Sequence, residues 1–201
     1  DDRYTEQAAE ECPEYEVMRN ERPFTRTLCE VVEELELQRI GYETEGITVA
    51  MLNRVQEALP EHIEWVPTDN LVEDLRAVKE PTEIELLARA AELGDQVFEH
   101  VLPYIKPGAT EKEIGFQFEC FAREIGAPSL AFDLICVSGV RSSHQHGGPT
   151  EKVLEPGDFV TMDFGVVHEG YVSDMTRTVV VGEASEKQRE VYETVLEAQE
   201  L

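Results

Sequence analysis

The stretch that decides the fold is Phe159-Val-Thr-Met-Asp-Phe-Gly-Val-Val-His-Glu-Gly-Tyr-Val-Ser-Asp-Met-Thr-Arg-Thr178. β-Branched and apolar residues flank both aspartates, and the Glu-Gly pair between them favours a turn, so the stretch predicts a β-hairpin. Two registers are open. A loop at residues 168–169 places Asp163 directly opposite Asp174. A loop at residues 169–170 makes the two aspartates diagonal neighbours on one face, with Cβ atoms about 7–8 Å apart.

Two carboxylates on one hairpin face repel each other unless a cation lies between them or one takes up a proton. Carboxylate oxygens bind hard and borderline divalent cations well, so the hairpin is a candidate metal site. A plain solvated face is the alternative, because this chain contains 43 Asp and Glu residues. The opposite face would be apolar, as in any half-exposed antiparallel pair, and would hold Val160, Met162, Phe164 and Val166.

Four stretches follow one another in an order that is specific to one family: Phe132-Asp-Leu-Ile-Cys-Val-Ser-Gly139, His146-Gly, Gly157-Asp-Phe-Val-Thr-Met-Asp-Phe-Gly165 and Gly170-Tyr-Val-Ser-Asp-Met-Thr-Arg-Thr178. Their order, spacing and residue types resemble the "pita-bread" metallopeptidase family of prolidase, aminopeptidase P, creatinase and methionine aminopeptidase. Two upstream segments resemble the prolidase and aminopeptidase P branch in particular. They are Asp74-Leu-Arg-Ala-Val-Lys79 with Glu83-Ile-Glu-Leu-Leu, and Asp2-Arg-Tyr-Thr-Glu-Gln-Ala8.

The resemblance implies an α+β fold, with the first lobe of the pita-bread catalytic domain preceded by part of an α/β N-terminal domain. We expect the N-terminal part to cover residues 1–80 and the lobe to cover residues 81–201. The periodicity of the sequence agrees with alternating helices and strands in the first part, and with two helices followed by strands in the second.

The resemblance also implies roles for individual residues. Asp163 matches the family's first metal-ligating aspartate, and Asp174 matches the second, which bridges two metal ions. His146 matches a histidine near the scissile peptide bond that serves substrate binding and proton transfer. Thr176 falls where a hydroxyl would support a metal ligand.

From the residues alone, His146 has a second interpretation as a solvated loop histidine, because Gly147-Gly-Pro149 marks a loop. His144 lies two residues earlier and is the other candidate to reach the site. The match of His146-Gly147 to the family motif favours His146.

The chemistry implied by the resemblance is hydrolysis of Xaa-Pro bonds by a water that two divalent metal ions (manganese, cobalt or zinc) activate. The substrate would be a peptide with proline at its second position. Xaa-Pro dipeptidase and Xaa-Pro aminopeptidase activity both remain open, and family members are commonly homodimers.

One departure from the family concerns the remaining ligands, a histidine and two glutamates that follow the matched region in family members. They have no counterpart before Leu201, and the chain begins at Asp1 instead of a methionine. We therefore expect a fragment of a longer protein that is inactive, or nearly so, by itself.

Two other functions use the same fold. A creatinase-like enzyme would hydrolyse a small guanidino substrate without the metal pair, and a metal-free binding module would keep the fold for protein interactions. The presence of both Asp163 and Asp174 favours the metallopeptidase over either.

The composition of the chain argues against several classes of function. A length of 201 residues allows one or two domains, and the net charge of −26 argues against binding to nucleic acid or to anionic membranes. The four cysteines form no C-x-x-C pair and suit reduced thiols in the cytoplasm. No apolar run approaches the length of a membrane span.

Local patterns predict the following elements. Helices are expected at Thr25–Ile40, Met51–Leu59 and Asn70–Lys79, then from a capping box at Thr82–Glu85 to Tyr104, from one at Thr110–Glu113 to Gly126, and from one at Ser185–Gln188 onward. Strands are expected at Gly46–Ala50, Glu64–Val66 and Leu130–Val137, with a loop carrying Arg141, His144 and His146 and a turn at Glu155–Asp158.

Overall fold

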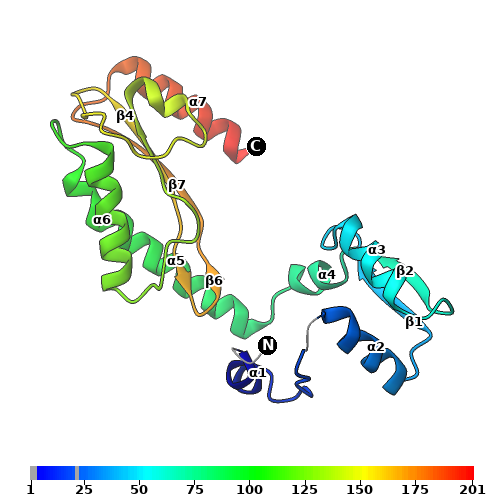
Figure 1. Cartoon of the computed structure of the whole chain (residues 1–201). Coiled ribbons are helices and arrows are strands. Elements are labelled where there is room, and N and C mark those ends of the chain that lie inside the picture. The colour runs from blue at the N-terminus through cyan, green and yellow to red at the C-terminus, as the bar shows by residue number, and fades with distance from the viewer. Residues whose placement is uncertain (1–3, 21–22) are drawn as a thin grey trace. The chain divides into compact units, whose positions relative to one another are not determined.

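The computed structural model describes residues 4–20 and 23–201 and divides into two compact units (Figure 1). The first unit ends at Val78 and the second runs from Lys79 to Leu201. Residues 2 and 3 of the stretch Asp2–Ala8 lie outside the described residues. In the part that the structure describes, no helix is both long and apolar enough to cross a membrane.

The first unit is built on a parallel strand pair. Its elements are α1 (Thr5–Glu11), α2 (Phe24–Glu34), β1 (Arg39–Glu43), α3 (Val49–Ala58), β2 (Glu64–Thr68) and α4 (Leu71–Ala77). Arg39 pairs with Glu64, and α3 makes the crossover that parallel strands require. The buried core of this unit comprises Val32, Val55, Leu59 and Ile63.

Two predictions for this unit were wrong. The helix expected at Thr25–Ile40 ends at Glu34, because Glu36 adopts a left-handed conformation (φ 49°) and the chain then enters β1. The strand expected at Gly46–Ala50 is a turn followed by the start of α3, where the Thr48 side chain accepts a hydrogen bond from the backbone N–H of Met51. The expected helix at 51–59, the strand at 64–66 and the helix at 70–79 are confirmed, with small shifts at their ends.

The second unit packs two helices against a three-stranded antiparallel sheet with strand order β3-β4-β7. Its elements are α5 (Pro81–Val101), η2 (Leu102–Tyr104), α6 (Glu111–Glu124), β3 (Ile135–Ser138), η3 (Gly139–Ser143), β4 (Phe159–Phe164), β5 (Val167–His168), β6 (Tyr171–Val172), β7 (Met175–Val180) and α7 (Glu186–Glu200). Figure 1 shows α5 and α6 side by side on one side of the long strands.

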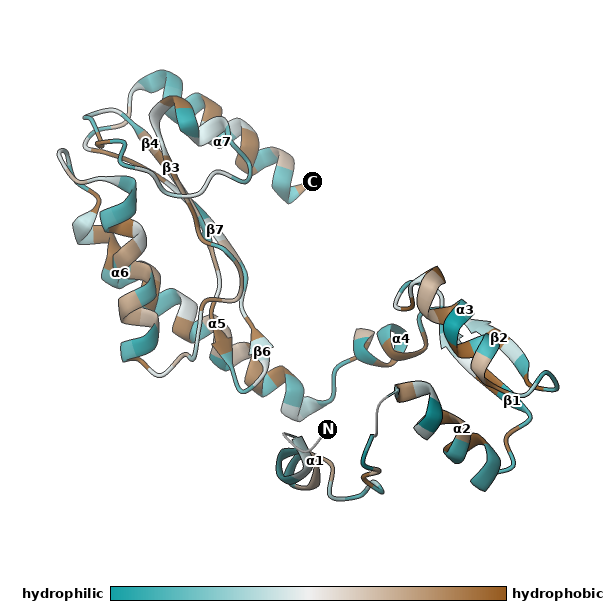
Figure 2. Ribbon diagram, viewed as in Figure 1, coloured by the Kyte–Doolittle hydropathy of each residue, from teal (hydrophilic) through white to brown (hydrophobic). Residues whose placement is uncertain are grey.

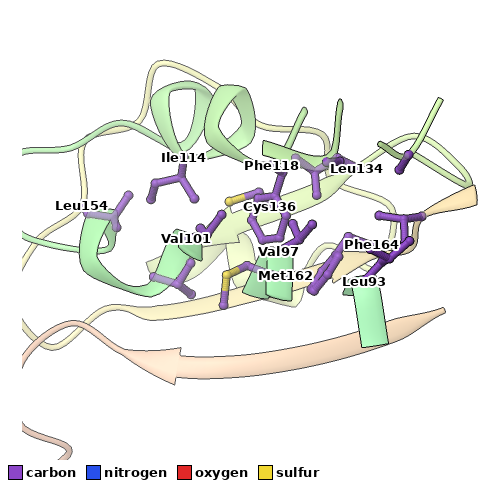
Figure 3. Close-up of a cluster of buried hydrophobic side chains, with 14 of the residues drawn as sticks. Leu93, Val97, Val101, Ile114, Phe118, Leu134, Cys136, Leu154, Met162 and Phe164 are labelled. Carbon is purple, nitrogen blue, oxygen red and sulfur yellow. The ribbon is translucent and has the colours of Figure 1, made fainter. Parts of the chain in front are cut away.

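The core of the second unit lies between these helices and one face of the sheet (Figure 3). Val160, Met162 and Phe164 alternate along β4 and are fully buried, as the sequence predicted for this face. The ring of Phe164 packs against Phe118 of α6, with ring centroids 4.6 Å apart, and stacks on Phe98 of α5 at 6.4 Å. In Figure 2, brown (hydrophobic) bands recur along the strands and along α5 and α6.

Capping side chains fix where the helices of this unit begin. The predicted capping boxes at Thr110 and at Ser185 are both confirmed. The box predicted at Thr82 was wrong, because α5 begins earlier, with Glu80 as its N-cap and Glu83 as the reciprocal partner. Pro81 explains the shift, since the first helical position suits a residue with no N–H and a fixed φ.

The last helix, α7, lies over the other face of the sheet. A groove there is lined by Thr161, Thr176 and Thr178 of the sheet and by Val191, Val195 and Leu196 of the helix, among others. This is the face that carries Asp163, so α7 and the candidate site share one side of the sheet.

Candidate metal centre

The hairpin between β4 and β7 has the register of the second predicted alternative. Its tip is a two-residue loop at Glu169 and Gly170, whose φ angles of 47° and 84° are typical of a type I′ turn. Asp163 therefore pairs with Thr176 and is the diagonal neighbour of Asp174.

Asp163 sits in the central strand of the sheet, between Ile135 of β3 and Thr176 of β7. Its side chain is half-buried, and its Oδ1 atom accepts a hydrogen bond of 2.9 Å from the hydroxyl of Thr176. This hydroxyl is the one that the sequence singled out as support for a ligand. The bond fixes the orientation of the carboxylate toward the solvated face.

Asp174 lies between β6 and β7, directly after Ser173, where the two arms of the hairpin approach each other closely. The backbone N–H of Ser173 donates to the carbonyl of Val166 at 3.0 Å, and the Ser173 hydroxyl accepts from the N–H of Val166 at 3.0 Å. Gly165 lies so close to Ser173 that a Cβ atom there would overlap the Ser173 carbonyl oxygen. Asp174 itself is exposed, on a backbone that its neighbours hold firmly.

The three predicted site residues, Asp163, Asp174 and His146, line one open pocket of about 600 Å³. The other lining residues are Phe132, Asp133, Leu134, Ile135 and Gly148. His146 is exposed and comes from the loop after η3, whereas His144 is not among the lining residues. His168, at the tip of the hairpin, pairs with Tyr171 outside the pocket.

One wall of the pocket comes from a segment whose predicted structure was wrong. The strand expected at Leu130–Val137 begins only at Ile135. Leu130 forms a bridge with Val166, and the N–H of Ala131 donates to the carbonyl of Gly165 at 2.9 Å. This pairing draws the chain toward the hairpin, so residues 132–134 bend away from the sheet and form the wall.

Sequence reasoning did not assign Phe132 or Asp133 to the site. Both lie in the stretch 132–139 that carries the family resemblance, which was the available signal. The expected regular strand would have placed them in the sheet ladder, and only the break before Ile135 brings them to the pocket.

Cys136 lies two residues beyond this wall and is fully buried. Burial, with a smaller contribution from the negative charge of Glu111, raises the pKa of the Cys136 thiol to about 12. A neutral thiol is a poor metal ligand, so the donors that the pocket offers are oxygen and nitrogen atoms.

The donors present fit a divalent cation in kind. Two carboxylates and an imidazole suit manganese, cobalt or zinc. They fall short in number, since the described residues contain no group of three or more His, Cys, Asp or Glu side chains placed to hold a metal ion. Asp163 and Asp174 alone therefore offer fewer donors than a divalent cation usually takes.

Comparison with known proteins matches both units of the chain. Residues 85–201 match the metallopeptidase family M24, and residues 1–78 match the creatinase/prolidase N-terminal domain. The Xaa-Pro dipeptidase of Pyrococcus furiosus is 42% identical over 136 residues, which are 68% of this chain and 39% of that protein.

Two solved structures are similar over almost the whole chain. An Xaa-Pro dipeptidase from Bacillus anthracis has a TM-score of 0.91 and 44% identity, covering 98% of this chain and 55% of that one. An X-Pro aminopeptidase from Thermotoga maritima has a TM-score of 0.90 and 38% identity, covering 100% of this chain and 55% of that one. The chain thus spans about half the length of these two relatives.

These matches confirm the α+β pita-bread architecture and the N-terminal domain that the sequence predicted. They also confirm the resemblance to the prolidase and aminopeptidase P branch, and a metallopeptidase family implies divalent metal ions. The chain belongs to metallopeptidase family M24.

Proposed function

We propose that the full-length protein carrying this chain is a metal-dependent peptidase that hydrolyses Xaa-Pro bonds. The observation that carries the proposal is the convergence of Asp163, Asp174 and His146 on one pocket. The names of the relatives, Xaa-Pro dipeptidase and X-Pro aminopeptidase, support the choice of substrate.

Asp163 and Asp174 would hold the metal, with Asp174 bridging two ions of manganese, cobalt or zinc. A histidine and two glutamates from outside this sequence would complete the coordination. When bound, the metal would lower the pKa of a coordinated water and polarise the peptide carbonyl. Thr176 keeps the Asp163 carboxylate oriented through the bond to its Oδ1 atom.

His146 would act on the substrate itself. Its imidazole lies at the pocket and is exposed, so it is free to hydrogen-bond the carbonyl oxygen of the scissile bond and to move a proton there. Phe132 and Leu134 give the same pocket an apolar wall, which suits the ring of a proline at the second position of a peptide.

The rest of the proposal concerns the whole protein. We place the boundary between the N-terminal domain (residues 1–80) and the catalytic lobe (residues 81–201) at residue 80. We expect a cytoplasmic homodimer that does not bind nucleic acid or membranes, in keeping with the net charge of −26.

The test uses the full-length protein loaded with Mn²⁺ and measures proline release from an Xaa-Pro dipeptide and cleavage of an Xaa-Pro-Xaa tripeptide. Asp174→Asn should reduce either activity at least about 100-fold, because an amide is a poor replacement for a bridging carboxylate. Glu169→Gln is the matched control, since it removes a carboxylate from the hairpin tip outside the pocket.

Cleavage of the dipeptide alone would identify a dipeptidase, and cleavage of the tripeptide would identify an aminopeptidase. A protein that binds metal but cleaves neither would contradict the proposal and favour the creatinase-like hydrolase. A protein that binds no metal would favour the binding module.

A further inference from the structure

A single buried carboxylate, that of Glu111 in the first turn of α6, collects five hydrogen bonds. Its Oε1 atom accepts from the backbone N–H and the hydroxyl of Ser138, at 2.7 and 2.9 Å. Its Oε2 atom accepts from the N–H and hydroxyl of Thr150, at 3.0 and 2.6 Å, and from Nε of Arg141 at 3.2 Å. Glu111 has no exposed surface.

These donors enclose the segment that carries His146. Ser138 ends β3, Arg141 lies in η3, and Thr150 follows the loop. Arg141 also donates from Nη2 to the carbonyl of Gly148 at 3.0 Å, so it ties the first part of the segment to its last part. Both ends of the segment and Arg141 of η3 therefore meet at one side chain.

The side chains of this segment lie outside the core. None of residues 139–149, all of which the structure describes, is buried, and Val140 is 90% exposed. The segment comes close to the rest of the unit at Pro149, which lies over Gly115 of α6, and at Gly147, which lies beside Val137 of β3. An exposed segment without a core of its own takes its conformation from its hydrogen bonds.

The energetics make the Glu111 interactions strong. A carboxylate without solvent is costly to bury unless hydrogen bonds and a counter-charge compensate it. Burial raises the pKa of Glu111, but the hydrogen bonds from Thr150 and Ser138 outweigh it and lower the pKa below its ordinary value. The carboxylate is thus charged at neutral pH, and each hydrogen bond to it is charge-assisted.

We propose that Glu111 is a positioning residue, whose buried carboxylate holds residues 138–150 in the conformation that places His146 at the pocket. Glu111 does not line the pocket and acts only through the segment that it binds. Its effect on catalysis rests on the function proposed above, whereas its effect on the segment does not.

The first test is independent of activity. Amide hydrogen exchange of residues 139–149 is measured in the full-length protein and in Glu111→Gln, which replaces one acceptor oxygen by an NH₂ group. We expect exchange in this segment to become at least about 10-fold faster, with β4 and β7 unchanged. Glu113→Gln is the matched control, because it changes an exposed glutamate of the same helical turn that caps Thr110.

Unchanged exchange in Glu111→Gln would overturn the proposal. Should Glu111→Gln fail to fold, Thr150→Val removes only the hydroxyl that bonds Oε2, and Thr150→Ser restores it. Amide exchange that is faster in Thr150→Val and normal in Thr150→Ser would support the proposal. Equal exchange rates in the two variants would overturn it.

The second test is a double-mutant cycle with His146→Ala in the Mn²⁺-loaded protein. Glu111→Gln should lower kcat/KM about 10- to 100-fold without changing the amount of bound metal. It should have little further effect once His146 is absent, because it acts through that residue. If the two reductions in kcat/KM multiply in the double variant, the proposed route through His146 is overturned. A wild-type protein with no peptidase activity would reject the proposed function. The exchange measurement would then decide the role of Glu111 by itself.

Discussion

At the scale of the residue, the Glu111 carboxylate makes stability depend on pH in a defined direction. Its pKa in the folded protein is below the ordinary value of 4.5, so the stability it contributes is fully present above pH 4.5 and is lost as pH falls through the folded pKa. Glu111→Gln should lower the free energy of unfolding by about 3 kcal/mol at pH 7, because Arg141 and the other donors lose their buried acceptor.

This difference between Glu111→Gln and the wild-type protein should shrink as the pH is lowered below 4.5. Thermal unfolding of the full-length proteins at several pH values measures it, with Glu113→Gln as the control. A difference that stays constant down to pH 3 would contradict the assignment of a charged, hydrogen-bonded Glu111.

The sequence could not identify Glu111 as an anchor. A glutamate directly after the helix N-cap Thr110 predicts an exposed residue that interacts with the helix dipole. Its burial depends on Ser138 and Thr150, which are 27 and 39 residues away in the chain. By contrast, Asp163 and Asp174 could be paired from the sequence because a hairpin brings near neighbours together.

At the scale of the element, the hairpin between β4 and β7 depends on Gly165. A methyl group there would meet the backbone carbonyl of Ser173, which has no room to move because Ser173 is bonded to Val166 and lies against Gly94 of α5. Gly165→Ala should destabilise the protein by at least about 3 kcal/mol, at the upper end for overpacking.

Gly148→Ala is the matched control for this change, since a Cβ atom at Gly148 would meet nothing within 4 Å. Thermal unfolding of the two variants makes the comparison. Equal stability of Gly165→Ala and Gly148→Ala would refute the role of the close approach.

Element boundaries show where local sequence stops being sufficient. The apolar alternation of β4 and the capping boxes at Thr110 and Ser185 are local, and each was predicted correctly. The apolar residues of the run 130–137 predict one strand, yet the first part of the run pairs with the hairpin instead. The pairing partner of Leu130 is Val166, which lies far along the chain, so a local window of sequence around residue 130 does not contain it.

At the scale of the whole molecule, the net charge of −26 is the dominant feature, with 43 acidic residues against 17 Lys and Arg. Repulsion between like charges opposes the compact state and is screened by salt. The melting temperature of the metal-free protein should therefore rise between about 0.01 M NaCl, where the screening length is roughly 30 Å, and about 1 M, where it is roughly 3 Å.

The measurement is made with a chelator present, so that metal binding does not contribute to the change. A melting temperature that falls with added NaCl would show that attractive ion pairs outweigh the repulsion. The described ion pairs are mostly exposed ones, such as Arg26–Glu30 and Lys187–Glu190, which contribute little.

The anchoring of residues 138–150 at one carboxylate has a consequence for protein engineering. Ser138, Arg141 and Thr150 must be kept to dock the segment on Glu111, and His146 for its place at the pocket. Gly139 and Gly147 must also be kept, because a Cβ atom at either would lie 2.6 Å from a side-chain atom of Asp158 or Val137. Exposed positions of the segment that neither bond Glu111 nor line the pocket, such as Val140 and Gln145, are open to exchange. The surface beside Asp163 and Asp174 can therefore be varied at these positions without redesigning the sheet that carries the two aspartates.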